Sequence, residues 1–343
     1  MKENIKNLNL LISYWLLITT LLVALIIVVG GLTRLTDSGL SITRWDLFSG
    51  ILPPLTQTDW ENYFELYKKI PEFQLINFNM TLEQFKVIFL WEYAHRLLGR
   101  VLGLFYFIPL IIFSFFKDLN KKHIFNYYLI LLLILLQGFI GWYMVRSGLS
   151  ERTDVSHYRL SVHLTLAFVI FIFLFWNYLK LTKERTAINV DKFTSCLIKL
   201  FFLLIIFQIS LGALVSGLDA GKIYNTWPLM NDVFFPDDSL YEDLFKFSIL
   251  ENPSLLQFLH RTTAYVIFFI FTLITILIFK NKNLIYLRKI SIIILVFIIF
   301  QIFLGVLTIL SGAEIFLASM HQIGSIILVS SVLILVFESS KIN

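Results

Sequence analysis

Cysteine is almost absent from this sequence of 343 residues, which contains Cys196 alone. A single cysteine excludes an intramolecular disulfide and any metal site built from several thiolates. Charged residues are also scarce, at 15% of the chain, whereas they make up about a quarter of a soluble globular protein. Hydrophobic residues account for 58% of the chain, and 35 residues are phenylalanine. No soluble fold buries that much apolar surface, so the composition indicates an integral membrane protein.

Long apolar runs separated by polar turns divide the chain into membrane-spanning segments. Each span needs about 20 apolar residues to cross a hydrocarbon core of about 30 Å. The sequence predicts eight spans, near 10–30, 96–116, 124–145, 159–180, 197–217, 257–279, 289–310 and 317–337. The first run is longer than the apolar region of a signal peptide and has no small-residue cleavage site after it. We therefore expect it to remain as the first helix of an all-α integral membrane protein.

The basic residues indicate which side of the membrane each connection faces. Lysine and arginine are concentrated in the turns 117–123, 180–192 and 280–289. Lys2 and Lys6 precede the first span. Because cytoplasmic loops carry an excess of basic residues, we expect these turns and both termini to be cytoplasmic. The two long loops, about 31–92 and 218–256, then lie on the outer side, and the second of them is acidic.

Four features of the first half of the chain return in the same order in the second half. They are an aspartate with a tryptophan eight residues later, a His-Arg pair, a Gln-x-x-x-Gly sequence followed by Ser-Gly, and a lone histidine near the outer end of a span. In the first half these are Asp37 and Trp45, His95 and Arg96, Gln137 to Gly148, and His163. In the second half they are Asp219 and Trp227, His260 and Arg261, Gln301 to Gly312, and His321.

This repetition indicates an internal duplication. Because each unit has four spans, both copies enter the membrane in the same direction. The sequence therefore predicts eight transmembrane helices arranged as two pseudo-twofold-related four-helix bundles. We expect an N-terminal half of residues 1–190 and a C-terminal half of residues 191–343.

Four of the six histidines lie inside predicted spans, near their outer ends: His95, His163, His260 and His321. Ionisable residues within a membrane are costly and mark candidate functional sites. Each half has one histidine on its second span and one on its fourth, so two imidazoles can face each other and bind an iron porphyrin from both sides. The alternative is that each histidine only hydrogen-bonds a neighbouring helix. His157 is a weaker candidate ligand, and His123 is expected to be solvated.

Arginines accompany these histidines. Arg96 and Arg261 each follow a histidine directly, and Arg100 lies one turn deeper than Arg96. Guanidinium groups pair well with carboxylates, so these arginines are candidates for binding the propionates of a haem. The alternative is that they extend to the lipid headgroups.

One residue breaks the symmetry of the duplication. Glu92 lies three residues before His95 and thus on the same helix face, whereas Gln257 holds the matching position before His260. A carboxylate there can accept a proton or stabilise a cationic intermediate, which favours chemistry in the N-terminal half. The alternative roles are an acid at a helix N-terminus or a salt bridge to Arg96.

The chain resembles the haem A synthase family over nearly its whole length. The resemblance rests on Gly-Gly-Leu-Thr-Arg-Leu-Thr-Asp-Ser-Gly-Leu-Ser at 30–41, Trp-Glu-Tyr-Ala-His-Arg-Leu-Leu-Gly-Arg at 91–100, Tyr-Arg-Leu-Ser-Val-His at 158–163, Leu-His-Arg at 259–261 and Met-His-Gln at 320–322. It implies an oxidoreductase that acts on a CH3 group, converting haem O to haem A for terminal oxidases. Successive hydroxylations turn a ring methyl into a formyl group.

The resemblance also implies roles for the site residues. His260 and His321, with Arg261, would bind a haem b cofactor in the C-terminal half. His95 and His163, with Arg96 and Arg100, would bind the substrate haem, and Glu92 would be the catalytic acid beside it. Some bacterial members carry a cysteine pair in the first outer loop, which this chain lacks. It therefore resembles the cysteine-free branch shared by mitochondria and related bacteria.

The implied setting is the inner membrane of a bacterial cell. The expected partners are the lipid bilayer, a haem O synthase and an electron-transfer protein, and no nucleic acid. The main alternative function is a non-enzymatic membrane di-haem b protein that transfers electrons. A transporter is a third class, but transporters place their substrate sites near the midplane of the membrane. The ionisable residues of this chain cluster at the outer end instead.

Overall fold

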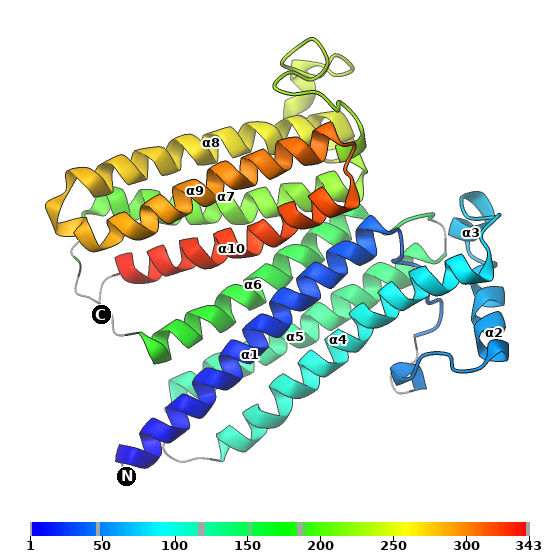
Figure 1. Cartoon of the computed structure of the whole chain (residues 1–343), viewed down its shortest axis with the longest axis horizontal. Helices are drawn as coiled ribbons and strands as arrows, with labels where there is room; N and C mark the ends of the chain where they lie inside the picture. The colour runs from blue at the N-terminus through cyan, green and yellow to red at the C-terminus, as the bar shows by residue number, and fades with distance from the viewer. Residues whose placement is uncertain are drawn as a thin grey trace. The chain divides into compact units, whose positions relative to one another are not determined.

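The computed structural model describes residues 2–45, 49–115, 121–150, 152–183, 188 and 190–340, and over these residues the chain is helical with no strand. Eight of the described helices are long and apolar enough to cross a membrane (Figure 1). They are α1 (Lys2–Leu35), α4 (Leu82–Ser114), α5 (Lys121–Gly148), α6 (His157–Thr182), α7 (Lys192–Gly217), α8 (Pro253–Lys280), α9 (Ile285–Leu310) and α10 (Ile315–Ser339). The predicted fold class, an all-α membrane protein with eight spans, is confirmed. The basic turns 117–123 and 180–192 lie partly outside the described residues.

The chain divides into two units, residues 1–174 and 175–343. The first contains α1, α4, α5 and most of α6. Within it, α1 lies along α4, and α4 lies beside α5. Trp15 of α1 joins the three helices: its ring stacks on Tyr106 of α4 at 4.7 Å and meets Tyr127 of α5 edge-on at 5.6 Å.

The helix that carries Glu92 and His95 begins earlier than its predicted span, at Leu82 instead of near residue 96. Thr81 caps it by accepting a hydrogen bond from the Gln84 backbone, while the Gln84 side chain accepts one from the Thr81 backbone. Such a capping box satisfies two backbone N–H groups at the helix start. Glu92 and His95 therefore lie in a continuous helix and not at its first turn.

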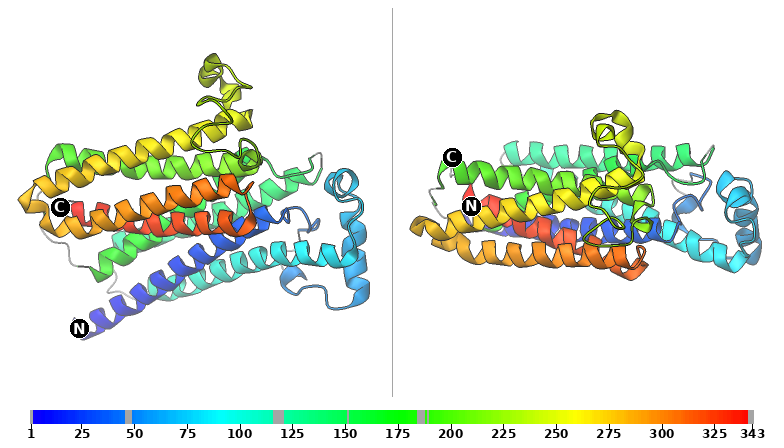
Figure 2. Two further views of the ribbon diagram at one scale, coloured as in Figure 1. Left: turned by 45° about the horizontal axis from the view of Figure 1, so that its top comes forward. Right: turned by 90° about the horizontal axis from the view of Figure 1, so that it is seen from above.

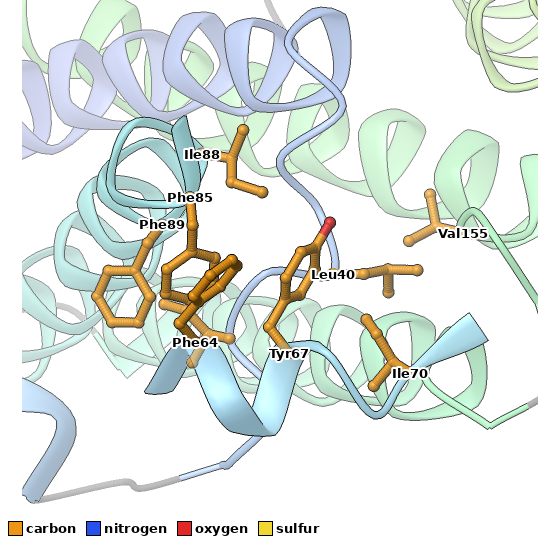
Figure 3. Close-up of a cluster of buried hydrophobic side chains, with 9 residues drawn as sticks. Leu40, Phe64, Tyr67, Ile70, Phe85, Ile88, Phe89 and Val155 are labelled. Atoms are coloured by element: carbon orange, nitrogen blue, oxygen red, sulfur yellow. The ribbon is translucent and has the colours of Figure 1, made fainter. Parts of the chain in front are cut away.

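The first outer loop is partly helical. It contains α2 (Gln57–Tyr67) and α3 (Pro71–Leu75), which pack on the outer extension of α4. Figure 3 shows the resulting cluster of buried side chains, which we call the outer cap. Its members are Leu40, Ile42, Phe64, Tyr67, Ile70, Phe85, Ile88, Phe89 and Val155. The outer cap brings together the loop after α1, the α2–α3 hairpin, α4 and the loop before α6.

The second unit contains α7 to α10, which run side by side (Figures 1 and 2). Each of the pairs α7–α8, α8–α9, α9–α10 and α10–α7 is in contact, so the four helices close into a bundle. Phe201 of α7 and Phe271 of α8 are fully buried, with their rings 4.6 Å apart. The pseudo-twofold relation between the bundles and the functional halves 1–190 and 191–343 stay predictions.

Candidate functional site

The structure brings the four membrane histidines together in two pairs. The rings of His95 on α4 and His163 on α6 have centroids 6.4 Å apart. The rings of His260 on α8 and His321 on α10 are also 6.4 Å apart. Each pair belongs to one unit, so each half has its own candidate site.

The separation suits two imidazoles that share one metal ion. A metal–imidazole bond is about 2 Å long, so two such bonds in line, with the radius of each ring, place the ring centroids about 6 Å apart. His95, His163 and His260 each have a buried Nδ1 that lacks a hydrogen-bond partner among the described residues. The described part of the chain holds no group of three or more His, Cys, Asp or Glu side chains placed to bind a metal. Two imidazoles alone fit an iron whose other ligands come from a porphyrin.

Each of the four histidines packs against a glycine on a neighbouring helix. A Cβ atom added to Gly30 would lie 2.8 Å from Cε1 of His95, and one added to Gly141 would lie 2.9 Å from that of His163. The corresponding distances are 3.1 Å for Gly212 and His260, and 3.0 Å for Gly305 and His321. Distances this short leave no room for a side chain, so the glycines set the position of the imidazoles.

Glutamines fix three of the four histidine-bearing segments. A glutamine Nε2 donates to the backbone carbonyl of the histidine: Gln137 to His163 at 3.0 Å, Gln208 to His260 at 2.9 Å and Gln301 to His321 at 2.6 Å. Each glutamine lies four residues before the glycine that contacts the same histidine. The sequence prediction found this spacing in α5 and α9 but missed it in α7. Ile26 occupies the fourth position, before Gly30.

Glu92 is 3% exposed, and its carboxylate accepts four hydrogen bonds. Oε1 accepts from Nε of Arg96 at 3.1 Å and from its Nη2 at 2.5 Å. Oε2 accepts from the Ser41 hydroxyl at 2.7 Å and from the Ile42 backbone N–H at 2.8 Å. The predicted salt bridge to Arg96 is therefore present, and the carboxylate also fixes the loop that follows α1.

Gln257 makes the opposite set of contacts. It is 1% exposed, and its Nε2 donates to the carbonyls of Ala220 at 2.8 Å and Ile223 at 2.6 Å. Its Oε1 accepts from Arg261 at 3.1 Å. Arg261 also donates to three loop carbonyls, those of Tyr224, Thr226 and Leu229.

The predicted arginines differ in how many of their donors are in use. Arg96 binds Glu92 and the carbonyls of Ile42 and Arg44, and its guanidinium lies 5.0 Å from the Trp45 ring. Nε of Arg261 is buried and has no partner within the described residues. Arg100 lies one turn below Arg96 on α4 and is half-buried. Binding of propionates by these three residues stays a prediction.

A cationic pocket of about 110 Å³ lies beside Arg96. Arg96, Trp142, Val145, Arg146, Leu149 and residues 42–45 line it. Arg44 and Arg146 are exposed, and neither side chain is bonded within the described part of the chain. Two lining residues, Arg96 and Trp142, directly follow His95 and Gly141 in the sequence. Sequence analysis missed Arg44 and Arg146 because no spacing relates them to a histidine.

The two other histidines are placed apart from the pairs. His157 is buried at the first residue of α6, and its ring lies 4.1 Å from that of Tyr158. His123 lies in the first turn of α5, with its ring 6.5 Å from that of Tyr127.

Comparison with known proteins identifies the relatives of the chain. The family model COX15-CtaA, described as cytochrome oxidase assembly protein, matches residues 13–333. A heme A synthase of Pelagibacter ubique is 49% identical over 334 residues, which cover 96% of this chain and 97% of the relative. A heme A synthase of Rickettsia prowazekii is 42% identical over 323 residues, covering 94% and 96% of the two chains. One of Rickettsia felis is 42% identical over 328 residues, with the same coverage.

Proposed function

Because the chain belongs to the COX15-CtaA family of cytochrome oxidase assembly proteins, we propose that it is a haem A synthase that converts haem O into haem A. The net change from a methyl to a formyl group adds one oxygen and removes two hydrogens. Two hydroxylations of the methyl carbon followed by loss of water accomplish it, which makes the protein an oxidoreductase acting on a CH3 group. The observation that supports the proposal is that Glu92 lies three residues before His95, whereas the neutral Gln257 holds the matching position before His260.

The N-terminal half is the proposed substrate site. His95 and His163 hold the iron of haem O, and the glycines packed against them fix the imidazoles. Arg44 and Arg146 offer guanidinium donors to the substrate propionates, alongside the predicted Arg96 and Arg100.

Glu92 is the proposed catalytic acid, and its contacts suggest how it takes up a proton. All four of its donors must stay in place while it is ionised, so protonation of Oε2 requires one donor to leave. The Ser41 hydroxyl can do so, because the carbonyls of Ser38 at 3.3 Å and Ile88 at 3.4 Å are alternative acceptors. Rotation of this hydroxyl exchanges an ionised for a protonated carboxyl without moving the backbone.

The C-terminal half is the proposed haem b site. His260 and His321 would hold the iron of haem b, and the buried Nε of Arg261 would donate to a propionate. When bound, haem b supplies one-electron redox chemistry. Gln257 offers no ionisable group there, so this half serves electron transfer away from the substrate site. The chain would lie in the inner membrane with both termini cytoplasmic, beside a haem O synthase and an electron-transfer partner.

Expression of the chain together with a source of haem O tests the proposal. Haems extracted from membranes are separated for the wild type, for Glu92→Gln and for the control Glu83→Gln, whose side chain is 79% exposed. We expect haem A from the wild type and the control, and a stall at haem O or the hydroxylated intermediate from Glu92→Gln. A wild type that binds haem b in both halves and forms no haem A would instead identify a di-haem b electron-transfer protein.

A further inference from the structure

A second buried carboxyl lies on α3, close in sequence to Ile70 of the outer cap. Glu72 is 5% exposed, although α3 belongs to a loop outside the membrane. Its Oε2 atom is buried and has no hydrogen-bond partner in the described ranges. An ionised carboxylate left unpaired in such a place would be costly, whereas a protonated one is tolerated.

Tyr67 is the polar group that acts most directly on Glu72, and its hydroxyl lowers the pKa of the Glu72 carboxyl. The Tyr67 oxygen accepts a hydrogen bond from Nδ2 of Asn77 at 2.8 Å. Tyr67 is fully buried, and this burial raises the pKa of its hydroxyl above the ordinary value. The tyrosine therefore keeps its own proton and does not neutralise Glu72.

The charged groups around Glu72 leave it without a cation. The charges of three carboxyl groups raise the pKa of Glu72: those of Glu92 on α4, Asp154 in the loop before α6 and Asp37 in the loop after α1. Arg96 pairs with Glu92, and Arg34 pairs with both aspartates, at 2.7 Å and 3.3 Å. Glu72 itself has no ion-pair partner among the described residues. Burial first, and the charge of Glu92 second, raise the pKa of Glu72 to about 8.

One loop contacts the surroundings of both acids. Ser41 and Ile42 donate hydrogen bonds to Glu92, and the adjacent Leu40 packs in the outer cap with Tyr67, whose hydroxyl acts on Glu72 (Figure 3). The two carboxyls thus differ in their hydrogen bonding: Glu92 accepts from four donors, and Oε2 of Glu72 has no partner among the described residues. Pairs of carboxyl groups whose environments separate their protonation in this way commonly divide acid and base roles between them.

We propose that Glu72 is a proton-transfer residue of the N-terminal site, protonated at neutral pH, which delivers its proton to Glu92 from the extracytoplasmic side. This role rests on the proposed function of that site. The transfer breaks the O–H bond of Glu72 and forms one on Oε2 of Glu92 as the Ser41 hydroxyl rotates away. Glu72 is then reprotonated from the outer surface through the cap.

Infrared spectroscopy of the purified full-length protein, without added haem O, tests the protonation state directly. We expect a carbonyl band of a protonated carboxylic acid at neutral pH that disappears as the pH passes about 8. Glu72→Gln, which keeps the shape of the neutral acid, should remove this band, and the exposed control Glu83→Gln should retain it. Tyr67→Phe should shift the band, because it removes the hydroxyl that acts on the Glu72 carboxyl. A band unchanged in Glu72→Gln would overturn the proposal.

The rate of haem A formation, followed from about pH 6 to about pH 9, tests the transfer. Removing a general acid or base commonly costs at least about a hundredfold in rate, and an assisting proton carrier should cost at least about tenfold. We expect Glu72→Gln to be slower by that amount with a flattened pH profile, and Glu83→Gln to match the wild type. Retained haem b absorbance identifies the variant as folded. If that absorbance is lost, the pH titration of the wild-type infrared band tests whether a protonated carboxyl with a pKa of about 8 is present.

The outcomes separate this proposal from the function on which it rests. If the wild type forms haem A, Glu92→Gln does not, and Glu72→Gln retains the wild-type rate and pH profile, Glu72 is a structural acid and the proposal is wrong. If the wild type forms no haem A at all, the proposed function itself fails.

Discussion

The two halves of the protein place their histidines at the same separation, yet their outer loops have opposite polarity toward the helix beside them. In the first half, Ser41 and Ile42 present donors, and Glu92 accepts. In the second half, Ala220 and Ile223 present carbonyls, and the Gln257 amide donates. The backbone of each loop therefore matches the side chain that it meets: an N–H group donates to the carboxylate, and carbonyl groups accept from the amide.

The two arginines extend this contrast. Arg96 gives two of its donors to Glu92, so the N-terminal half holds a neutralised ion pair near its histidines. Arg261 gives its donors to loop carbonyls and to a neutral amide, so its positive charge has no acid among the contacts described. A net positive charge would stabilise an anionic propionate at the proposed haem b site. A neutral pair would bind a propionate less strongly at the proposed substrate site.

The largest expected effect distinguishes the halves by their ligands. His260→Ala and His321→Ala should each abolish the low-spin absorbance of haem b, because one imidazole then lacks its partner. His95→Ala and His163→Ala should retain that absorbance and lose haem A formation. Optical spectra of the purified proteins, combined with haem extraction, check both results. Full retention of the haem b spectrum in either C-terminal variant would contradict the ligand assignment.

An intermediate effect is expected from exchanging the residue that breaks the symmetry. Gln257→Glu directs a carboxylate at two carbonyl oxygens and leaves them without donors, which should cost about 3 kcal/mol or more in stability. Thermal unfolding monitored by haem b release measures the loss. The matched control is Glu83→Gln, an exposed exchange of the same two residue types. A Gln257→Glu protein as stable as the wild type would show that the loop carbonyls do not require an amide at this position.

A smaller effect is expected at the glycines. Gly212→Ala and Gly305→Ala each place a methyl group within about 3 Å of a histidine ring, and overpacking of this kind costs about 1–3 kcal/mol. Lower haem b occupancy, or a shifted haem b spectrum, is the expected result. Gly103→Ala and Gly138→Ala are matched controls, because an added Cβ meets no atom within 4 Å at either position. Equal occupancy in all four variants would remove the glycines from the site.

The apolar runs and the repeated spacing of histidines were sufficient to predict the eight helices and the residues that the structure brings together. The hydrophobic effect selects the apolar runs that become the eight helices. The repeated spacing then indicates which histidines lie on the second and fourth helices of each half. The outward extension of α4 also had a signal: Phe85, Ile88, Phe89 and Glu92 follow helical spacing, and all four are buried. It was missed because the prediction stopped at the edge of the apolar run.

Other contacts could not be predicted from the sequence. Besides Arg96, the donors to Glu92 are a backbone N–H and a serine hydroxyl that lie 50 and 51 positions away in the chain. Glu72 looks like an ordinary surface acid in the sequence, yet it is buried in the folded loop. Both depend on how an irregular loop folds over a helix, and no periodic pattern specifies that.

Asp37 and Asp219 lie just beyond the ends of α1 and α7, and both adopt a left-handed backbone conformation, with φ of 49° and 51°. Each lies seven positions after the glycine that receives a histidine ring, Gly30 or Gly212. Seven residues of helix span about 10 Å, so the position of the aspartate fixes how far the histidine ring lies from the end of the helix. Inserting one residue between them would rotate the glycine away by about 100°. The length of this short segment is therefore as constrained as its composition.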